Sequence, residues 1–338
     1  MRFTIIVPIF NAEMYVRQCL ESLLAQSFRD FEVIMVDDGS IDNSVVICNE
    51  YCARDHRFRL EFHERNKGAS AARNTGIANA LGDYLLFLDN DDWWDSDSAL
   101  KNVDSALRAW GDPDVLCYPL GEYRKGDSAP RKETYRLEGN IDAKSSYQSA
   151  ALAIVQQGLY YSSASSKTVK RAVVESNSLR FDEEFRHNED SEWSRKLLLA
   201  ASSIGWLDTS FYVYRRNSDV SQSSHPDYRN VLDSLLSIIE RQIRDNDNEA
   251  YDMVHCELAS AFIAYIYVLA LSYAGILRED AGSDSFEFLK QNRWLLRYPG
   301  QKRVAYVRWC MRVVGFRATS RLLGFVMRRE QQRITESK

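Results

Sequence analysis

The first ninety residues alternate between short apolar runs and longer segments in which apolar residues recur at helical spacing. Each apolar run is rich in β-branched or aromatic residues and stops at a polar turn, which is typical of a buried strand. The pattern predicts strands at 3–9, 31–36 and 59–62, and helices at 11–26, 42–51 and 69–80. Strands that alternate with helices predict right-handed crossovers and a parallel sheet.

A fourth apolar run, Gly82–Leu88, ends abruptly in three carboxylates at Asp89, Asp91 and Asp92. Like charges this close raise one another's pKa, so a site that keeps them ionised usually holds a cation between them and a phosphate. The alternative is a polar turn whose last aspartate caps the following helix. The stretch by itself leaves both interpretations open.

The second predicted strand also ends in carboxylates, at Asp37 and Asp38, followed by Gly39-Ser40. In parallel sheets, ligands bind beyond the carboxyl ends of the strands. We therefore expect the aspartates after the second and fourth strands to belong to one site.

Between residues 98 and 224 the pattern is looser. It predicts helices at 98–110, 146–157 and 185–202, strands at 115–118, 159–162 and 210–216, and a polar hairpin or mobile loop at 121–141. Asn188 is expected to cap the third helix, whose first turn carries Glu189, Asp190 and Glu192. Acidic residues at the start of a helix interact favourably with the helix dipole. Stabilisation of the helix end alone is therefore an alternative to a catalytic role.

After about Pro226 the periodicity is helical throughout, so we expect two domains, 1–225 and 226–338. Leu258–Leu277 is uncharged over a length that could span a bilayer, although its Ser, Gly and Tyr residues favour a buried or subunit-interface helix. Trp294–Met327 is basic and amphipathic. Such a helix can lie on an anionic membrane surface, and a solvated helical face is the alternative.

Composition places the chain among ordinary soluble globular proteins, with 338 residues, 45% hydrophobic and 27% charged. Its six cysteines lack the spacing of a zinc site or a disulfide framework, which favours a reducing, cytoplasmic location. The apolar run before Pro8 is shorter than a secretion signal requires. Although the net charge is -5, the C-terminal segment is basic. From Arg293 onward it contains twelve Lys and Arg residues and only two acidic residues, Glu330 and Glu336.

Three stretches together carry a family resemblance. VPIFNAEMYVRQCLESLLAQSFRDFEVIMVDDGSIDNS, NKGASAARNTGIANALGDYLLFLDNDDWW and NEDSEW resemble, in order, the motifs of the family 2 glycosyltransferases with the GT-A fold. The resemblance covers about Phe3 to Arg216 and does not extend past Pro226. It implies an α/β fold with a Rossmann-like, mostly parallel sheet flanked by helices, followed here by a helical C-terminal region.

The resemblance also implies a donor site for a nucleotide sugar, most simply a uridine diphosphate (UDP) sugar. Asp38, or Asp37 instead, would accept a hydrogen bond from the uracil N–H. Asp91 would bind Mn²⁺ or Mg²⁺, with Asp89 as a second ligand or near the ribose, and Asp92 would be structural or face the acceptor. The full set implied for nucleotide binding is Pro8, Phe10, Asn11, Asp37, Asp38, Lys67, Arg73, Asp89 and Asn90.

The resemblance assigns the catalytic base to Asp190, with Glu189 as the neighbouring candidate. A carboxylate within reach of the acceptor hydroxyl suffices as a base, and direct attack opposite the leaving group implies inversion. Further candidates are more weakly implied. Trp93 and Trp94 would pack beside the donor sugar, with a core role for one of them as the alternative. Arg215, Arg216 or His225 would close over the diphosphate.

One motif of the processive family members, Gln-X-X-Arg-Trp, has no full counterpart, because Gln291–Trp294 is one residue short and lies in the wrong region. Addition of a single sugar is therefore expected, in bacterial surface-polysaccharide biosynthesis of the capsule or O-antigen kind. The expected acceptor is a glycan or lipid-linked saccharide, reached in the cytoplasm or at the inner face of the plasma membrane. Peripheral membrane contact and homo-oligomerisation stay open, and no nucleic-acid partner is expected.

Two other function classes are alternatives to this one. A nicotinamide-dependent dehydrogenase would need a glycine-rich turn after the first strand, where this chain has Pro-Ile-Phe-Asn. A catalytically inactive sugar-nucleotide-binding or scaffold protein would retain the same donor residues, so the sequence leaves that alternative open.

Overall fold

The computed structural model describes residues 1–132, 134–216, 227–298 and 301–336. The chain divides into two compact units, one of residues 1–150 and 161–225 and the other of residues 151–160 and 226–338. The segment 151–160, which follows the start of α5 (Tyr147–Gln156), thus groups with the helical unit rather than with the first domain expected from the sequence.

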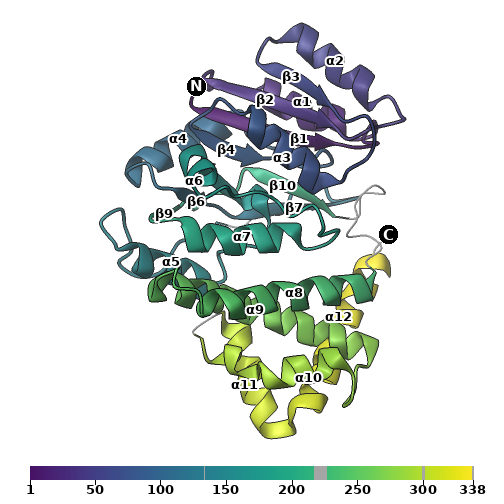
Figure 1. Ribbon diagram of the computed structural model, residues 1–338. Helices are drawn as coiled ribbons and strands as arrows, with labels where there is room; N and C mark the ends of the chain where they lie inside the picture. The colour runs from purple at the N-terminus through teal and green to yellow at the C-terminus, as the bar shows by residue number, and fades with distance from the viewer. Residues whose placement is uncertain (133, 217–226, 299–300, 337–338) are drawn as a thin grey trace. The chain divides into compact units, whose positions relative to one another are not determined.

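A seven-stranded sheet forms the centre of the first unit, in the order β3-β2-β1-β4-β8-β6-β9 (Figure 1). β1 pairs in parallel with β2 and β4, β2 with β3, and β6 with β9, whereas β8 runs antiparallel to both of its neighbours. The predicted α/β fold with a mostly parallel sheet is confirmed. The strands are β1 (Phe3–Ile9), β2 (Phe31–Asp37), β3 (Phe58–Phe62), β4 (Tyr84–Phe87), β6 (Val115–Cys117), β8 (Lys167–Lys170) and β9 (Ile204–Trp206).

Alternate residues of the central strands face two helical layers, as the pleat of a strand requires. Phe3, Ile5 and Val7 belong to the core shared with α1, α2 and α4. On the opposite face, Ile6 packs against α3 so closely that a Cβ at Gly76 would lie 2.4 Å from its side chain. The helices of this unit are α1 (Val16–Leu24), α2 (Ser44–Arg54), α3 (Ala69–Asn79), α4 (Ala99–Ala109), α6 (Arg171–Ser176) and α7 (Glu189–Ala200).

A small second sheet, ordered β5-β10-β7, lies beyond the carboxyl end of β4. β10 (Tyr212–Arg216) pairs antiparallel with β5 (Trp93–Trp94) and parallel with β7 (Leu120–Arg124). This pairing brings residues from the end of the first unit against the aspartates that follow β4. The polar stretch at 121–141 therefore begins as a paired strand.

Three details differ from the sequence-based predictions. The strand expected at 159–162 is wrong, because the chain instead forms a 3-10 helix, η1 (Ala164–Ser166), followed by β8. The strand β9 was not anticipated. Asn188 precedes α7 as expected but adopts a φ of 62°, and its side chain makes no capping hydrogen bond.

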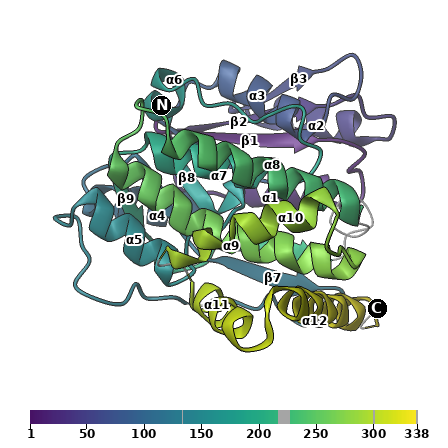
Figure 2. The same ribbon diagram turned by 60° about the horizontal axis from the view of Figure 1, so that its bottom comes forward.

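The second unit is helical and is built around α9 (Met253–Leu277) (Figure 2). Within the described residues, α9 alone is long and apolar enough to cross a membrane by length and composition, and 72% of its apolar window is buried. Gly275 of α9 and Gly324 of α12 let the two helices touch, since a Cβ on Gly275 would lie 1.9 Å from the Ser320 carbonyl oxygen. The other elements are α8 (Tyr228–Asn246), α10 (Asp284–Gln291), η3 (Arg293–Arg297), α11 (Lys302–Val314) and α12 (Phe316–Glu336).

Candidate active site at the strand ends

Asp89, directly beyond β4 and Leu88, is joined to two segments that are distant in sequence. Its Oδ1 accepts a hydrogen bond from Arg73 Nη2 of α3 at 2.9 Å. Its Oδ2 accepts one from Ser165 Oγ of η1 at 3.4 Å. These bonds connect the end of β4 to α3 on one side and to the segment before β8 on the other. The strand order reverses between β1 and β4, and open α/β sheets bind their ligands at such a point.

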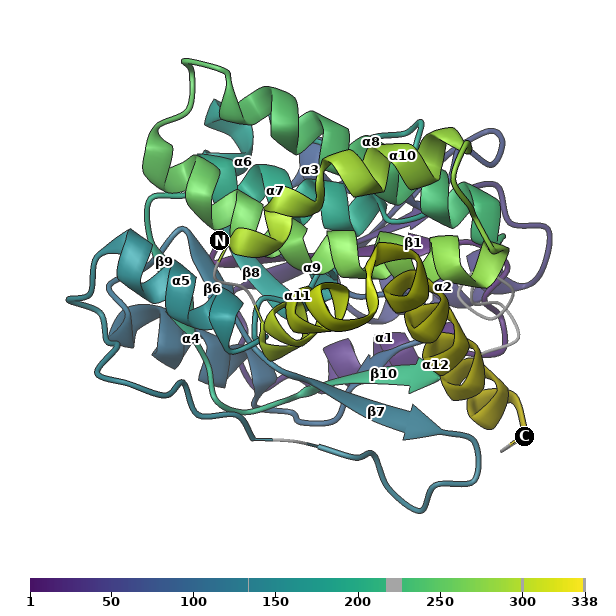
Figure 3. The same cartoon turned by 90° about the horizontal axis from the view of Figure 1, so that it is seen from below.

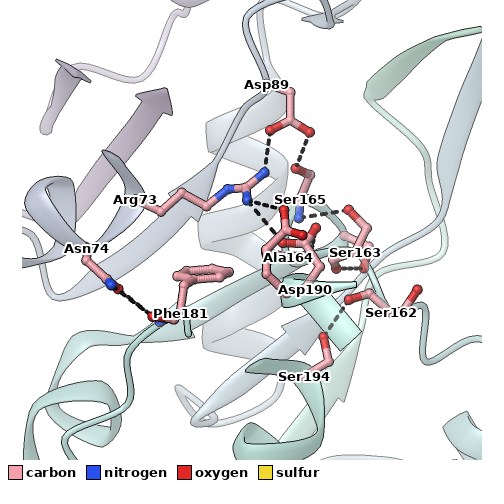
Figure 4. A network of polar contacts seen from close by, with 12 residues as sticks. Arg73, Asn74, Asp89, Ser162, Ser163, Ala164, Ser165, Phe181, Asp190 and Ser194 are labelled. Carbon is pink, nitrogen blue, oxygen red and sulfur yellow. Dashed lines mark hydrogen bonds and ion pairs between the residues drawn. The ribbon is translucent and has the colours of Figure 1, made fainter. Parts of the chain in front are cut away.

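Arg73 is the centre of this site (Figure 4). Its side chain is buried, and its Nη1 lies 3.1 Å from Glu189 Oε1 and 3.3 Å from Asp190 Oδ1 at the start of α7. Although burial disfavours the charged form, the three surrounding carboxylates hold the pKa of Arg73 above its ordinary value. One guanidinium thus gathers the predicted donor-side carboxylate and both predicted catalytic carboxylates into a single cluster.

Asp190, the predicted base, has contacts to both of its carboxylate oxygens. Its Oδ2 accepts a hydrogen bond from the backbone N–H of Ala164 at 3.1 Å, and its Oδ1 faces Arg73. Burial raises the pKa of Asp190 to about 6, with Arg73 opposing the shift and the charges of Glu189 and Asp89 adding to it. A carboxylate with a pKa near 6 is still mostly ionised at neutral pH and is a stronger base than an ordinary aspartate.

Lys167 holds the segment 161–166, which includes the Ala164 N–H that donates to Asp190. This lysine is fully buried, and its Nζ donates to the carbonyl oxygens of Tyr161 and Ser163, the second at 2.7 Å, and to Ser166 Oγ at 3.2 Å. Ser194 Oγ of α7 donates to the Ser162 carbonyl oxygen at 2.7 Å. The backbone of residues 161–166 is therefore held to β8 and to the helix that carries Asp190.

Asp92 has a structural role. It is buried, its Oδ2 accepts from Tyr212 O–H at 2.6 Å, and its Oδ1 accepts from the Arg215 backbone N–H at 2.7 Å. Burial, together with the charges of Asp91 and Asp89, raises the pKa of Asp92 well above its usual range. Of the two roles expected for Asp92, the structural one fits these contacts, because both oxygens hold β10 in place.

Asp38 and Asp37, at the end of β2, are bound differently from each other. Asp38 Oδ1 lies 2.6 Å from His63 Nδ1 and accepts from Lys67 N–H, while its Oδ2 accepts from Gly68 N–H at 2.7 Å. Asp37 Oδ2 accepts from the backbone N–H groups of the following turn. Asp37 Oδ1 is buried without a hydrogen-bond partner in the described part of the chain. Asp37 thus has an acceptor to offer a ligand, whereas Asp38 fastens the loop before α3.

The predicted residues after β1 lie beside those after β4. Asn90 Nδ2 donates to the Pro8 carbonyl oxygen at 2.9 Å. Asn11 adopts a φ of 45°, donates its backbone N–H to Ser40 Oγ and accepts from Ile41 N–H. Phe10 is exposed. The structure therefore brings the ends of β1, β2 and β4 together, as the sequence indicated.

The structure places the more weakly implied residues, and Lys67 of the nucleotide-binding set, in different environments. Arg215 donates through Nε to the Asp91 carbonyl oxygen at 2.7 Å and stacks over Trp93 at 4.6 Å. Trp94 is buried against Phe211, so it belongs to the core. Arg216 instead binds Glu122 on the neighbouring strand. The Lys67 side chain is exposed beside the Asp38 loop, and His225 lies outside the described residues.

A divalent cation fits this site only when a ligand supplies further oxygens. No group of three or more His, Cys, Asp or Glu side chains in the described ranges could hold a metal ion. Both oxygens of Asp89 already accept hydrogen bonds, from Arg73 and Ser165, which fits its expected place as a second ligand or near the ribose. Mg²⁺ commonly uses one or two carboxylates plus substrate phosphates, and this all-oxygen donor set suits it or Mn²⁺.

Sequence reasoning missed four residues that organise the site: His63, Ser165, Lys167 and Tyr212. His63 follows β3 at the same sheet edge as Asp38, and that position was a usable signal. The other three lie on segments whose pairing is not encoded locally. Tyr212 reaches Asp92 only because β10 pairs with β5.

Comparison with known proteins decides the family. Residues 4–162 match the model of Glycosyl transferase family 2, and the match spans β1 to β4 and the carboxylates beyond them. The chain belongs to this glycosyltransferase family. It is 34% identical over 239 residues to the uncharacterized glycosyltransferase EpsJ of Bacillus subtilis, covering 69% of this chain and 66% of EpsJ.

Two further relatives have similar identity. The putative glycosyltransferase EpsH of Bacillus subtilis is 32% identical over 219 residues, covering 63% of this chain and 60% of EpsH. The glycosyltransferase GlyA of Streptococcus pneumoniae is 31% identical over 223 residues, or 63% of this chain and 30% of GlyA. This glycosyltransferase thus spans less than two thirds of each of these curated relatives.

Solved structures share the fold. The S. aureus protein TarS, residues 1–349, superposes with a TM-score of 0.68 at 21% identity, covering 98% of this chain and 92% of that one. The same region of TarS has been solved with UDP and with UDP-GlcNAc. The mannosyltransferase PcManGT of Pyrobaculum calidifontis, solved with GDP-Man and Mn²⁺, gives a TM-score of 0.51 at 14% identity over 96% of this chain and 87% of PcManGT. These likenesses establish the GT-A fold for this glycosyltransferase.

Proposed function

We propose that this glycosyltransferase moves a single sugar from a UDP-sugar to a hydroxyl group of a glycan acceptor, with inversion at the anomeric carbon. The observation that carries the proposal is the joint binding of Asp89 and Asp190 by Arg73. This contact keeps a donor-side carboxylate and a candidate base close together, as a displacement between two neighbouring substrates would use them. The UDP complexes of TarS support a uracil ligand, as does the buried Asp37 Oδ1, which has no hydrogen-bond partner among the described residues.

In the proposed reaction, Asp190 accepts the proton of the acceptor hydroxyl while that oxygen forms its bond to the anomeric carbon. The bond from that carbon to the diphosphate oxygen breaks, and its electron pair leaves with UDP. Arg73 keeps Asp190 ionised and holds it in place. Asp91, with Asp89 beside it, would hold a divalent cation, which would neutralise the charge on the departing diphosphate.

The acceptor and setting are extensions of this proposal. We place the reaction in the cytoplasm, at the inner face of the plasma membrane, acting on a lipid-linked saccharide in surface-polysaccharide biosynthesis. All six cysteines are free thiols, which supports a reducing compartment. The absence of a full Gln-X-X-Arg-Trp motif supports addition of one sugar.

A panel of nucleotide sugars with and without Mn²⁺ tests the proposal, scored by the melting temperature and by release of the nucleotide. We expect UDP compounds to raise the melting temperature only with the metal. Asp91→Ala should abolish that rise, whereas Asp190→Asn should retain it and stop nucleotide release. Equal loss of binding in both variants would remove Asp190 as the base. UDP binding without release by the unaltered protein would instead indicate an inactive sugar-nucleotide binder.

A further inference from the structure

The last two helices of the second unit expose an unusual share of large apolar side chains. Of the sixteen that are exposed among the described residues, seven lie between positions 306 and 326. Soluble surfaces carry exposed apolar residues singly, and a concentration of them marks a surface that another phase or molecule covers. They are Tyr306, Trp309, Val313, Val314, Leu322, Phe325 and Val326.

The exposed residues of α11 form a face of their own. The inward face is made by Val304, Val307 and Cys310, which are buried within the unit. Tyr306, Trp309 and Val313 recur at i, i+3 and i+7 on the outward side and are 61%, 58% and 61% exposed. The helix is therefore apolar on two sides, and packing within the unit accounts for only one of them. Figure 3 shows α11 and α12 in front of α9 at this end of the unit.

This apolar face lies in a strongly basic setting. Between Lys302 and Arg329 the chain has eight basic residues and no acidic one, although its overall net charge is -5. Arg308 and Arg312 are exposed one turn apart on α11 and make no ion pair within the described residues. On α12 the guanidinium of Arg329 stacks 4.7 Å over the Phe325 ring.

We propose that the outward faces of α11 and α12 dock on an anionic phospholipid bilayer. Trp and Tyr favour the boundary between headgroups and acyl chains, and arginines attract anionic headgroups while their stems cover apolar surface. A symmetric contact with a second copy fits less well, because it would pack two basic segments together with no acidic residue between Lys302 and Arg329 to pair with Arg308 or Arg312. The inference is independent of the proposed transfer reaction, and bilayer binding can be measured without any sugar donor.

The test uses the full chain with sedimented vesicles, of phosphatidylcholine alone or with about one third phosphatidylglycerol. We expect binding to the anionic vesicles only, and weaker binding at high salt. The triple variant Tyr306→Ser/Trp309→Ser/Val313→Ser should lower the partition coefficient between vesicles and water at least about tenfold. The reason is that it removes most of the exposed apolar area on the outward face of α11. Arg308→Glu/Arg312→Glu should lower it about fivefold for each arginine.

A control variant, Val46→Ser/Lys101→Glu, changes an exposed apolar and an exposed basic residue of the first unit and should bind as the unaltered chain does. Far-ultraviolet circular dichroism and melting temperature establish that every variant is folded. Equal recovery with neutral and anionic vesicles would overturn the proposal, as would unaltered binding by the triple variant. Loss of a dimer in the triple variant, without vesicle binding by the parent, would assign the face to a second copy instead.

Discussion

The guanidinium of Arg73 lies 3.3 Å from the carboxylate of Asp190, and the Arg73 side chain is buried while that of Asp190 is 21% exposed. The same guanidinium binds Asp89 at 2.9 Å. A change in the charge or position of Arg73 must therefore act on the proposed base and on the donor-side carboxylate together. This coupling gives the pH dependence of the reaction a structural origin.

The first prediction concerns that pH dependence. Burial raises the pKa of Asp190 to about 6, and only the ionised form can accept a proton. The value of kcat/KM should therefore be constant above about pH 7 and fall about tenfold for each pH unit below 6. A profile of initial rates against pH checks this, with donor binding followed in parallel by melting temperature. An acid limb centred near the ordinary aspartate value of about 4 would contradict the role of the buried carboxylate.

Arg73 is tested by two substitutions that separate its charge from its shape. Arg73→Lys keeps a positive charge but loses the fork that reaches Asp89, Glu189 and Asp190 at once, so kcat/KM should fall about 100-fold. Arg73→Gln also removes the charge that favours ionised Asp190. The pKa of that base should rise, and the acid limb should move to higher pH than in the lysine variant. Identical acid limbs in both variants would refute the electrostatic coupling.

Lys167 provides a test of positioning away from the reacting atoms. Lys167→Met leaves the Tyr161 and Ser163 carbonyl oxygens without their buried donor, so the segment that presents Ala164 N–H to Asp190 should loosen. We expect kcat to fall about tenfold or more, with little change in UDP-dependent stabilisation. Lys170→Met is the matched control, because Lys170 lies on the same strand and its Nζ donates to the backbone carbonyl oxygen of Asp112 at 3.2 Å. Equal loss of kcat in both variants would indicate a general effect on β8.

The local pattern was sufficient for the first half of the sheet. β1, β2 and β4 each combine an apolar run with a polar stop, so the pattern predicts their positions and the aspartates at the ends of β2 and β4 directly. β8 could not, because its sequence, Lys-Thr-Val-Lys, has one apolar residue and is buried by pairing with β4 and β6. A strand whose burial comes from its neighbours leaves no apolar run. The apolar pattern therefore predicts a strand at 159–162, which is more apolar, instead of at β8.

The site was predictable in its residue types and less so in its connections. Asp89, Glu189 and Asp190 were expected at one site, but Arg73 was placed near the nucleotide rather than among the carboxylates. Sequence spacing does not reveal that α3 points its arginine across β4 toward α7. Asp38 is predicted to accept from the uracil ring, and the sequence does not reveal its contact with His63 or its bonds to the Lys67 and Gly68 N–H groups of the loop before α3.

Asp92 should matter for stability. Asp92→Ala removes the acceptor of both Tyr212 O–H and Arg215 N–H in a buried setting, so the free energy of unfolding should fall by about 2 to 4 kcal/mol. Urea unfolding at neutral pH measures the change. The exposed Asp97→Ala is the control, which should stay within about 0.5 kcal/mol. A similar small change for Asp92→Ala would show that β10 does not depend on this carboxylate.

The crossing of α9 and α12 gives the last prediction. A Cβ on Gly275 would lie 1.9 Å from the Ser320 carbonyl oxygen, and one on Gly324 would lie 2.4 Å from the Gly275 carbonyl carbon. Neither contact can be relieved by turning a side chain, because backbone opposes backbone. Gly275→Ala should therefore lower the free energy of unfolding by about 3 kcal/mol, despite the higher helix propensity of alanine. Ala318→Ser, at an exposed position of α12, should change it by less than about 1 kcal/mol. A stabilised Gly275→Ala variant would mean that the two helices do not cross at these glycines.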